Sequence, residues 1–194
     1  GMANFDIVKQ AYELVAKYNN QIALLQCTST YPTKFDEIHL NVIRTYKKEF
    51  PNTIIGYSGH ELGIIIPSIA VALGAKIIER HFTLDRTMKG GDHAASLEPG
   101  GFEKMVRDIR NVEKALGKSE KSIQESEQPV FKKLAKSIVS LNSIPKGTII
   151  TRNMLTTKGP GNGISPMKMN ELIGKKTLLD IPMDVVINEE DIEW

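Results

Sequence analysis

The chain has 194 residues, with 25 Lys and Arg side chains against 23 Asp and Glu, and 41% of its residues are apolar. This composition is typical of a soluble globular protein and excludes a chain that is disordered over most of its length. The nearly balanced charge excludes a basic nucleic-acid-binding domain.

One cysteine, Cys27, excludes an internal disulfide, so we expect a reducing compartment and interpret the protein as cytoplasmic. The longest apolar stretch, residues 62–75, is interrupted by two glycines and a proline. It is also shorter than the ~20 residues that a membrane helix needs. The chain begins with an amphipathic, charged segment rather than a signal peptide. We therefore expect no interaction with a membrane.

In the first 117 residues, segments of helical periodicity alternate with short apolar runs. The runs are too short for helices and predict three strands, at 22–27, 53–57 and 75–82. The first of these reads as a strand buried on both faces. Four helices are expected around the strands, at 6–18, 38–50, 67–73 and 102–116. This alternation is typical of a parallel sheet of βα units, which is either doubly wound or belongs to a barrel. Three strands are too few to close a barrel, so in the second case the chain holds only part of one.

The sequence changes character after residue 117. Residues 118–133 are polar and have the composition of a linker. Apolar runs separated by turn signals then predict a compact, mostly β module at 134–194, with strands at 137–141, 148–150, 177–179 and 185–187. One short helix is expected at 165–173, with Ser165 as its N-cap and Pro166 in its first turn. The glycine-rich loop at 158–163 is either a tight turn or a loop that covers another surface.

Three of the four histidines lie at or just after the ends of predicted strands. His60 and His81 each end a strand, and His93 follows a glycine pair. Because parallel strands end at the same edge of a sheet, two imidazoles there can meet at one Zn, Mn or Fe(II) ion. Two histidines that only form hydrogen bonds explain the same pattern, and the residue types alone do not decide. His39 lies on the polar side of a predicted helix, and we expect no role for it.

Several other polar residues follow the predicted strands. Ser58 lies two residues before His60, but the Gly-x-Ser-x-Gly elbow of a hydrolase is absent, as are the glycine spacings of nucleotide loops. Asp92 can hold a sugar hydroxyl or cap a turn. Tyr31 can face a ligand or act as a lid. Cys27 is expected to be a small, buried apolar side chain.

Four clusters occur in a fixed order: QCTSTYP at 26–32, GYSGH at 56–60, ERHFTLD at 79–85 and DHAASLEP at 92–99. Together they resemble the sialic acid synthase (N-acetylneuraminate synthase) family. The tail resembles the antifreeze-like SAF domain of that family through KSIV at 136–139, IPKG at 144–147 and GKK at 174–176. The resemblance implies that residues 1–117 form the last three units of a (β/α)8 TIM barrel. A linker at 118–133 and a small, mostly β SAF domain at 134–194 would follow.

The resemblance implies an enzyme that condenses phosphoenolpyruvate with N-acetylmannosamine, or with a related amino sugar or its phosphate, and releases phosphate. It implies a divalent metal, Mn²⁺ with Mg²⁺ or Co²⁺ as alternatives, held by His60 and His81. Four further side chains match substrate contacts: Ser29 and Ser58 for phosphoenolpyruvate, and Tyr31 and Asp92, the two catalytic candidates, for the amino sugar.

Two features depart from the family pattern. Relatives that use N-acetylmannosamine often carry Lys-Arg-Pro-Gly in the tail loop, with the arginine reaching the barrel of a partner subunit. Gly159 stands in that place here, so Lys158 and Asn162 become the candidates for this contact. The identity of the acceptor sugar is therefore left open, and precursors of legionaminic and pseudaminic acid are among the candidates.

The second departure is length, because five barrel strands are absent. We therefore expect a C-terminal piece of the enzyme and leave open whether this piece is active by itself. Its open sheet is expected to make copies of the chain associate through their apolar faces. The family implies a domain-swapped dimer. Two other readings are a carbohydrate- or partner-binding module without turnover and a metal-dependent aldolase or isomerase on the same barrel. Ice binding is disfavoured because charged residues are scattered through the tail.

Overall fold

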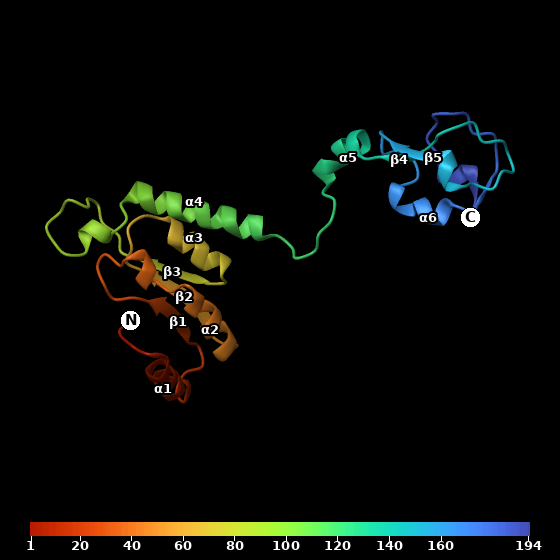
Figure 1. Ribbon diagram of the computed structural model, residues 1–194. Coiled ribbons are helices and arrows are strands. Elements are labelled where there is room, and N and C mark those ends of the chain that lie inside the picture. The colour runs from red at the N-terminus through yellow and green to blue at the C-terminus, as the bar shows by residue number, and fades with distance from the viewer. The chain divides into compact units, whose positions relative to one another are not determined.

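The computed structural model describes residues 1–194, which form two compact units, residues 1–119 and 120–194 (Figure 1). None of the helices combines the length and the hydropathy that a membrane span requires.

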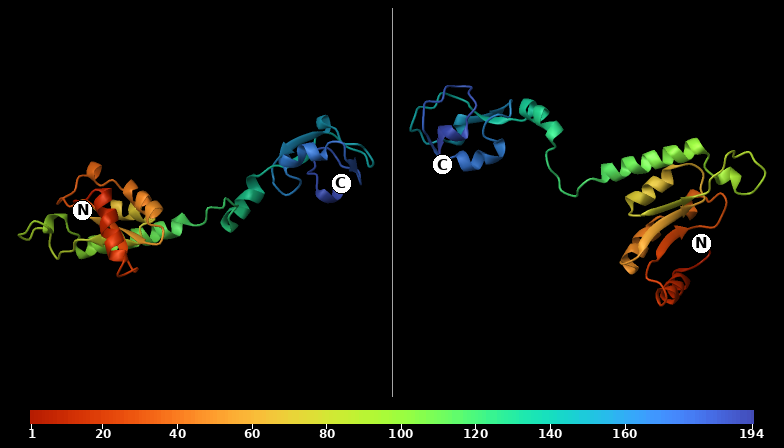
Figure 2. Two further views of the ribbon diagram at one scale, coloured as in Figure 1. Left: turned by 90° about the horizontal axis from the view of Figure 1, so that it is seen from below. Right: turned by 180° about the vertical axis from the view of Figure 1, so that it is seen from behind.

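The first unit is a three-stranded parallel sheet with helices between the strands (Figures 1 and 2). The strands are β1 (Ala23–Cys27), β2 (Ile54–Gly59) and β3 (Ile77–Arg80), paired in the order β1-β2-β3. The helices are α1 (Phe5–Ala16), α2 (Asn41–Glu49), α3 (Ile65–Ala72) and α4 (Pro99–Leu116). The predicted parallel α/β arrangement is confirmed.

Local chemistry explains where several of these helices begin. The Asn4 side chain accepts a hydrogen bond from the Ile7 amide and caps α1, and Pro99 occupies the first turn of α4, where its missing N–H costs nothing. The expected helix at 38–50 begins three residues late. His39 precedes it in a left-handed conformation with φ of 50°, so the prediction that His39 lies on the helix is wrong.

Only one face of the sheet is covered. Ile55 and Tyr57 of β2 pack with Ile43 of α2 and Ala70 of α3 in one apolar core. On the other face, the side chains of Ile54 and Ile77 are 53% and 38% exposed. The expectation that the first strand is buried on both faces is therefore wrong for this chain, because β1 contributes one buried residue and its remaining positions are exposed or half-buried.

The second unit contains two antiparallel strand pairs, β4 (Ser137–Ser140) with β5 (Leu155–Lys158), and β6 (Lys176–Thr177) with β7 (Ile192–Glu193). A short turn at Pro166–Lys168 leads into α6 (Met169–Leu172), and the Ser165 hydroxyl accepts from the Met167 amide as predicted. The core is almost entirely isoleucine and leucine: Ile138, Ile144, Ile150, Leu155, Ile164, Leu172, Ile181, Ile187 and Ile192.

Parts of this second unit differ from expectation. Residues 148–150 and 185–187 form isolated bridges, Ile149 with Lys176 and Val186 with Val139, instead of strands. Strands β5 and β7 were not expected. The segment expected to be a linker carries helix α5 (Gln128–Leu134), whose residues are all exposed.

Candidate active site

Two imidazoles meet where β2 and β3 end. The ring centroids of His60 and His81 are 5.1 Å apart, and the rings are nearly perpendicular. His60 is 5% exposed, whereas the side chain of His81 is 34% exposed. His60 Nδ1 lies 2.8 Å from the carbonyl oxygen of Thr28. Because a carbonyl can only accept, Nδ1 carries the proton and the lone pair of Nε2 is left free.

This pair fits a divalent metal ion. A ring centroid lies about 3.2 Å from an ion bound at ~2.1 Å to one of its nitrogens, so two rings on one ion at tetrahedral angles have centroids about 5 Å apart. The Nδ1–H bond of His60 to a backbone oxygen is the outer contact that metal-binding histidines usually make. The chain has no group of three or more His, Cys, Asp or Glu side chains that could hold a metal. Two imidazoles alone would leave the remaining coordination positions to water or substrate oxygens.

Tyr31 and Asp92 complete this cluster. The ring of Tyr31 is 4.3 Å from that of His60 and 5.3 Å from that of His81, and Tyr31 is 46% exposed. Asp92 Oδ2 is 3.7 Å from His81 Nδ1. The Asp92 side chain makes no capping hydrogen bond at the following turn, which leaves its carboxylate free to meet a ligand.

Two contacts fold the loop that brings Asp92 to His81. The Arg86 guanidinium donates to the carbonyl of Ala94 through Nε at 3.0 Å and through Nη2. His93 Nδ1 is 2.7 Å from the hydroxyl of Thr83. His93 is therefore paired within the loop and is not part of the His60 and His81 pair.

Ser58 and Ser29 occupy different surroundings. The buried Ser58 hydroxyl donates to Glu79 Oε1 at 2.8 Å, across the paired strands β2 and β3. Glu79, which is exposed, was not among the expected site residues, although its position two residues before His81 in a strand was the available signal. Ser29 lies at the end of β1, with its hydroxyl 3.8 Å from Cys27 Sγ.

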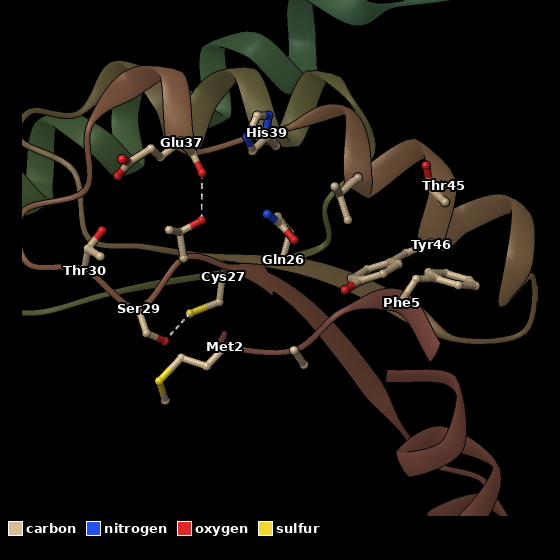
Figure 3. A pocket seen from close by; sticks show the side chains of 13 residues that line it. Met2, Phe5, Gln26, Cys27, Ser29, Thr30, Glu37, His39, Thr45 and Tyr46 are labelled. Carbon is tan, nitrogen blue, oxygen red and sulfur yellow. Dashed lines mark hydrogen bonds between the residues drawn. The ribbon is translucent and has the colours of Figure 1, made fainter. Parts of the chain in front are cut away.

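Ser29 and Cys27 line a cavity of about 630 Å³ that is also bordered by Met2, His39 and Tyr46 (Figure 3). Cys27 is half-buried, so the expectation of a buried side chain is wrong. The reason is that its face of the sheet has no covering layer. His39 is exposed at the rim of this cavity.

A buried ion pair lies directly beside the two histidines in sequence. Arg80 Nη1 donates to Glu61 Oε1 at 2.7 Å and both side chains are fully buried. Arg80 also donates to the carbonyls of Glu61 and Gly63, and the Tyr57 hydroxyl donates to Glu61 Oε2 at 2.7 Å. We call Tyr57, Glu61 and Arg80 the buried triad.

The titration behaviour of the triad follows from its burial. Burial, with the hydrogen bond to the Glu61 carboxylate, raises the pKa of Tyr57 well above its ordinary value. Burial lowers the pKa of Arg80, and the negative charge of Glu61 opposes this effect. The signal in the sequence was an arginine inside an apolar strand, since arginine is almost never fully buried unless it is paired.

The two tail candidates, Lys158 and Asn162, lie in the second unit. Lys158 Nζ forms an ion pair with Asp184 at 2.5 Å, and Asn162 is exposed. The fully buried Ser137 holds their loop, because its hydroxyl donates to the Pro160 carbonyl at 2.6 Å and accepts from the Gly163 amide at 2.9 Å. The loop is thus fixed to β4 and presents Asn162 outward.

Comparison with known proteins identifies the family models that the two parts of the chain match. Residues 1–121 match the NeuB family model and residues 135–193 match the SAF domain model. The chain is 48% identical over 194 residues to the N-acetylneuraminate-9-phosphate synthase of Homo sapiens, which covers 100% of the chain and 54% of that protein. It is 41% identical over 192 residues to the N,N'-diacetyllegionaminic acid synthase of Campylobacter jejuni, covering 97% of the chain and 57% of that protein.

A solved N-acetylneuraminic acid synthetase from Leptospira borgpetersenii superposes with a TM-score of 0.61 at 38% identity, covering 67% of the chain and 45% of that structure. The chain spans about half the length of the curated relatives it matches. The chain belongs to the NeuB family, carrying part of the family's TIM barrel followed by an SAF domain.

Proposed function

We propose that this chain supplies the metal-binding and acceptor-binding part of a nonulosonic acid synthase, which condenses phosphoenolpyruvate with a phosphorylated N-acetylmannosamine. The observation that carries the proposal is the meeting of His60, His81, Tyr31 and Asp92 at the carboxyl ends of parallel strands in a NeuB family chain. Active sites of βα barrels lie at this end of the strands.

In the proposed reaction the methylene carbon of phosphoenolpyruvate attacks the aldehyde carbon of the open-chain sugar. A new carbon–carbon bond forms, the aldehyde oxygen becomes an alkoxide and takes a proton, and water adds to the carbon that bears the phosphate. The bond between this carbon and the phosphate oxygen then breaks, and phosphate leaves with the electron pair. A divalent ion held by His60 and His81, Mn²⁺ in this proposal, supplies Lewis-acid polarisation of the aldehyde when it is bound.

The residues of the chain have separate tasks in this scheme. The Thr28 carbonyl holds His60 with Nε2 available for the ion. Asp92 orients the acceptor hydroxyl or the attacking water, as its free carboxylate beside His81 allows. The Tyr31 ring lies against both imidazoles and faces the acceptor in this proposal. Ser58 and Ser29 bind phosphoenolpyruvate.

The names of relatives support a phosphorylated acceptor. The human and mouse proteins, each 48% identical to this chain, are named N-acetylneuraminate-9-phosphate synthase. Three carbons from phosphoenolpyruvate are added ahead of the sugar's first carbon, so a phosphate on carbon six of the acceptor becomes the 9-phosphate of the product. Because Lys158 is paired with Asp184, Asn162 is the tail residue that we assign to acceptor contact.

We further infer that copies of the chain associate. The uncovered sheet face exposes Ile54 and Ile77, and β1 and β3 are both edge strands. Apolar side chains and open strand edges of this kind drive pairing between chains. A homo-oligomer joined at this face follows.

The first test is Mn²⁺ binding measured by calorimetry. The parent chain is compared with a His60→Ala/His81→Ala double variant, and His39→Ala is the control because that imidazole is exposed and makes no ring contact with the pair. We expect a micromolar site in the parent and in the control and none in the double variant. Absence of binding in the parent would reject the proposal for this chain.

The second test is turnover after the preceding five βα units of a relative are supplied as a separate chain. Phosphate release that requires both phosphoenolpyruvate and the amino sugar supports a synthase. A faster rate with the sugar 6-phosphate than with the free sugar supports the phosphorylated acceptor, and the reverse order contradicts it. Release of phosphate without any acceptor would contradict the condensation itself.

A further inference from the structure

The buried triad joins the two strand ends that carry the imidazoles. Glu61 directly follows His60, and Arg80 directly precedes His81. The guanidinium of Arg80 holds Glu61 twice, at its carboxylate and at its backbone carbonyl 2.6 Å away, and reaches the Gly63 carbonyl at 3.0 Å. These bonds span from β3 to the segment that leaves β2.

Strand geometry explains how these bonds hold the backbone beside the histidines. Neighbouring residues of a strand point to opposite faces of the sheet. Arg80, opposite Gly59, therefore lies on the same face of the sheet as Tyr57, and its bonds fix the end of β3 directly before His81. The Tyr57 hydroxyl completes the arrangement by occupying Glu61 Oε2, so that both carboxylate oxygens have one partner each.

The free-energy cost of burying the charged groups of the triad indicates that the triad has a role besides stability. Replacing a buried ion pair by apolar side chains is often neutral or stabilising, so the pair itself is weak evidence of a stabilising purpose. Here Arg80 Nε is buried without any hydrogen-bond partner, which adds a further desolvation cost. The guanidinium thus serves three acceptors in the segment that leaves β2, whereas its own Nε–H has no partner.

We propose that Tyr57, Glu61 and Arg80 are positioning residues that set the distance between His60 and His81 for a divalent ion. The inference rests on the proposed function, because it assigns the ion to that pair. It predicts that weakening the triad loosens the imidazole pair before it unfolds the sheet.

The test uses the full chain with two conservative variants. Arg80→Lys keeps the positive charge but cannot reach three acceptors, and Tyr57→Phe removes only the hydrogen bond to Glu61. Arg110→Lys makes the same change in the exposed pair of Arg110 with Glu113 and is the matched control. Mn²⁺ affinity is measured by calorimetry at a temperature well below the unfolding midpoint of each variant.

We expect Arg80→Lys to weaken Mn²⁺ binding by about 10-fold to 100-fold, Tyr57→Phe by less, and Arg110→Lys not at all. Should Arg80→Lys fail to fold, the same comparison is made with Tyr57→Phe alone. Variants that unfold at a lower temperature and yet bind Mn²⁺ with the affinity of the parent would overturn the proposal, because the triad would then only stabilise the fold.

A second readout needs no metal. Nuclear Overhauser contacts between the ring protons of His60, His81 and Tyr31 report their spacing in the metal-free chain. We expect these contacts in the parent and their weakening in Arg80→Lys. If the parent binds no Mn²⁺, the proposed function fails, but unchanged ring contacts in the variants would still overturn the positioning role, and lost contacts would support it.

Discussion

The Thr28 carbonyl, at the end of β1, lies 2.8 Å from Nδ1 of His60, which follows the end of β2. This hydrogen bond fixes the tautomer of the imidazole, since only a protonated Nδ1 can serve a carbonyl. We predict that the neutral imidazole of His60 is the Nδ1–H tautomer. Long-range proton–nitrogen correlation spectra of the metal-free chain check this, with the His60→Gln variant assigning the signal. An Nε2–H tautomer would be incompatible with the site described above.

The free carboxylate of Asp92 leads to a prediction that separates stability from catalysis. Asp92→Asn removes no capping bond, so we expect the free energy of unfolding to change by less than about 0.5 kcal/mol. In the chain supplied with five βα units of a relative, we expect phosphate release to fall by about 10²-fold to 10⁴-fold, as loss of a proton-transfer group does. Asp108→Asn, at an exposed pair with Arg107, is the control. Full activity in Asp92→Asn would remove it from the reaction.

The uncovered face of the sheet gives a prediction about association. Ile54→Glu and Ile77→Glu place charges on this face, where the native side chains are 53% and 38% exposed. We expect sedimentation velocity at micromolar concentration to show oligomers of the parent and monomers of the double variant, with little change in unfolding temperature. Leu14→Glu, on the exposed side of α1, is the control. A parent that sediments as a monomer would contradict association through this face.

In the second unit, the fully buried Ser137 hydroxyl serves two groups of the 158–163 loop. Ser137→Ala leaves the Pro160 carbonyl and the Gly163 amide without this partner, so we expect a loss of about 1–3 kcal/mol in the free energy of unfolding. Urea denaturation of the parent, of this variant and of the exposed Ser143→Ala measures the difference. Equal stability of the two variants would show that the loop does not depend on Ser137.

The loop that carries Asp92 contains an acid with a lowered pKa. The Thr87 hydroxyl and amide both donate to Asp85 Oδ1 at 2.7 Å, and these bonds hold the pKa of Asp85 below its ordinary value. A carboxyl with a lowered folded-state pKa stabilises above its unfolded-state pKa, and this contribution disappears as the pH falls through the folded-state value. Thr87→Val removes the hydroxyl bond, so we expect the pKa of Asp85 to rise. Carbon-13 titration of the carboxyl group measures it, and an unchanged midpoint would contradict the assignment.

Much of the barrel part is accessible from the sequence because each element has a local cause. The run at 22–27 is too apolar and too short for anything but a strand, and the pattern at 102–116 has helical spacing. The strand ends then bring His60 and His81 to one edge of the sheet, whatever the exact boundaries are. Ser165 could likewise be assigned as a cap from its position before Pro166.

Other features depend on contacts between residues distant in sequence. The approach of Asp92 to His81 depends on the bonds of Arg86 with Ala94 and of His93 with Thr83, which no local pattern predicts. Strand β5 pairs with β4 across the 141–154 connection, and its residues, Leu-Thr-Thr-Lys, are only weakly apolar. Helix α5 lies in the segment whose sequence predicts a linker, because polar residues precede it and Pro129 is a turn signal as well as a helix-starting position.

The triad also has a consequence for the folding of the sheet. A slip of β3 by one residue along β2 would exchange the two faces of β3, so that Arg80 would leave the face of Tyr57 and Glu61 would lie buried without its counter-ion. Such a shifted pairing therefore leaves a buried charge uncompensated, a penalty that apolar side chains alone would not impose. The same ion pair selects the one register in which Ser58 meets Glu79 and Gly59 meets Arg80.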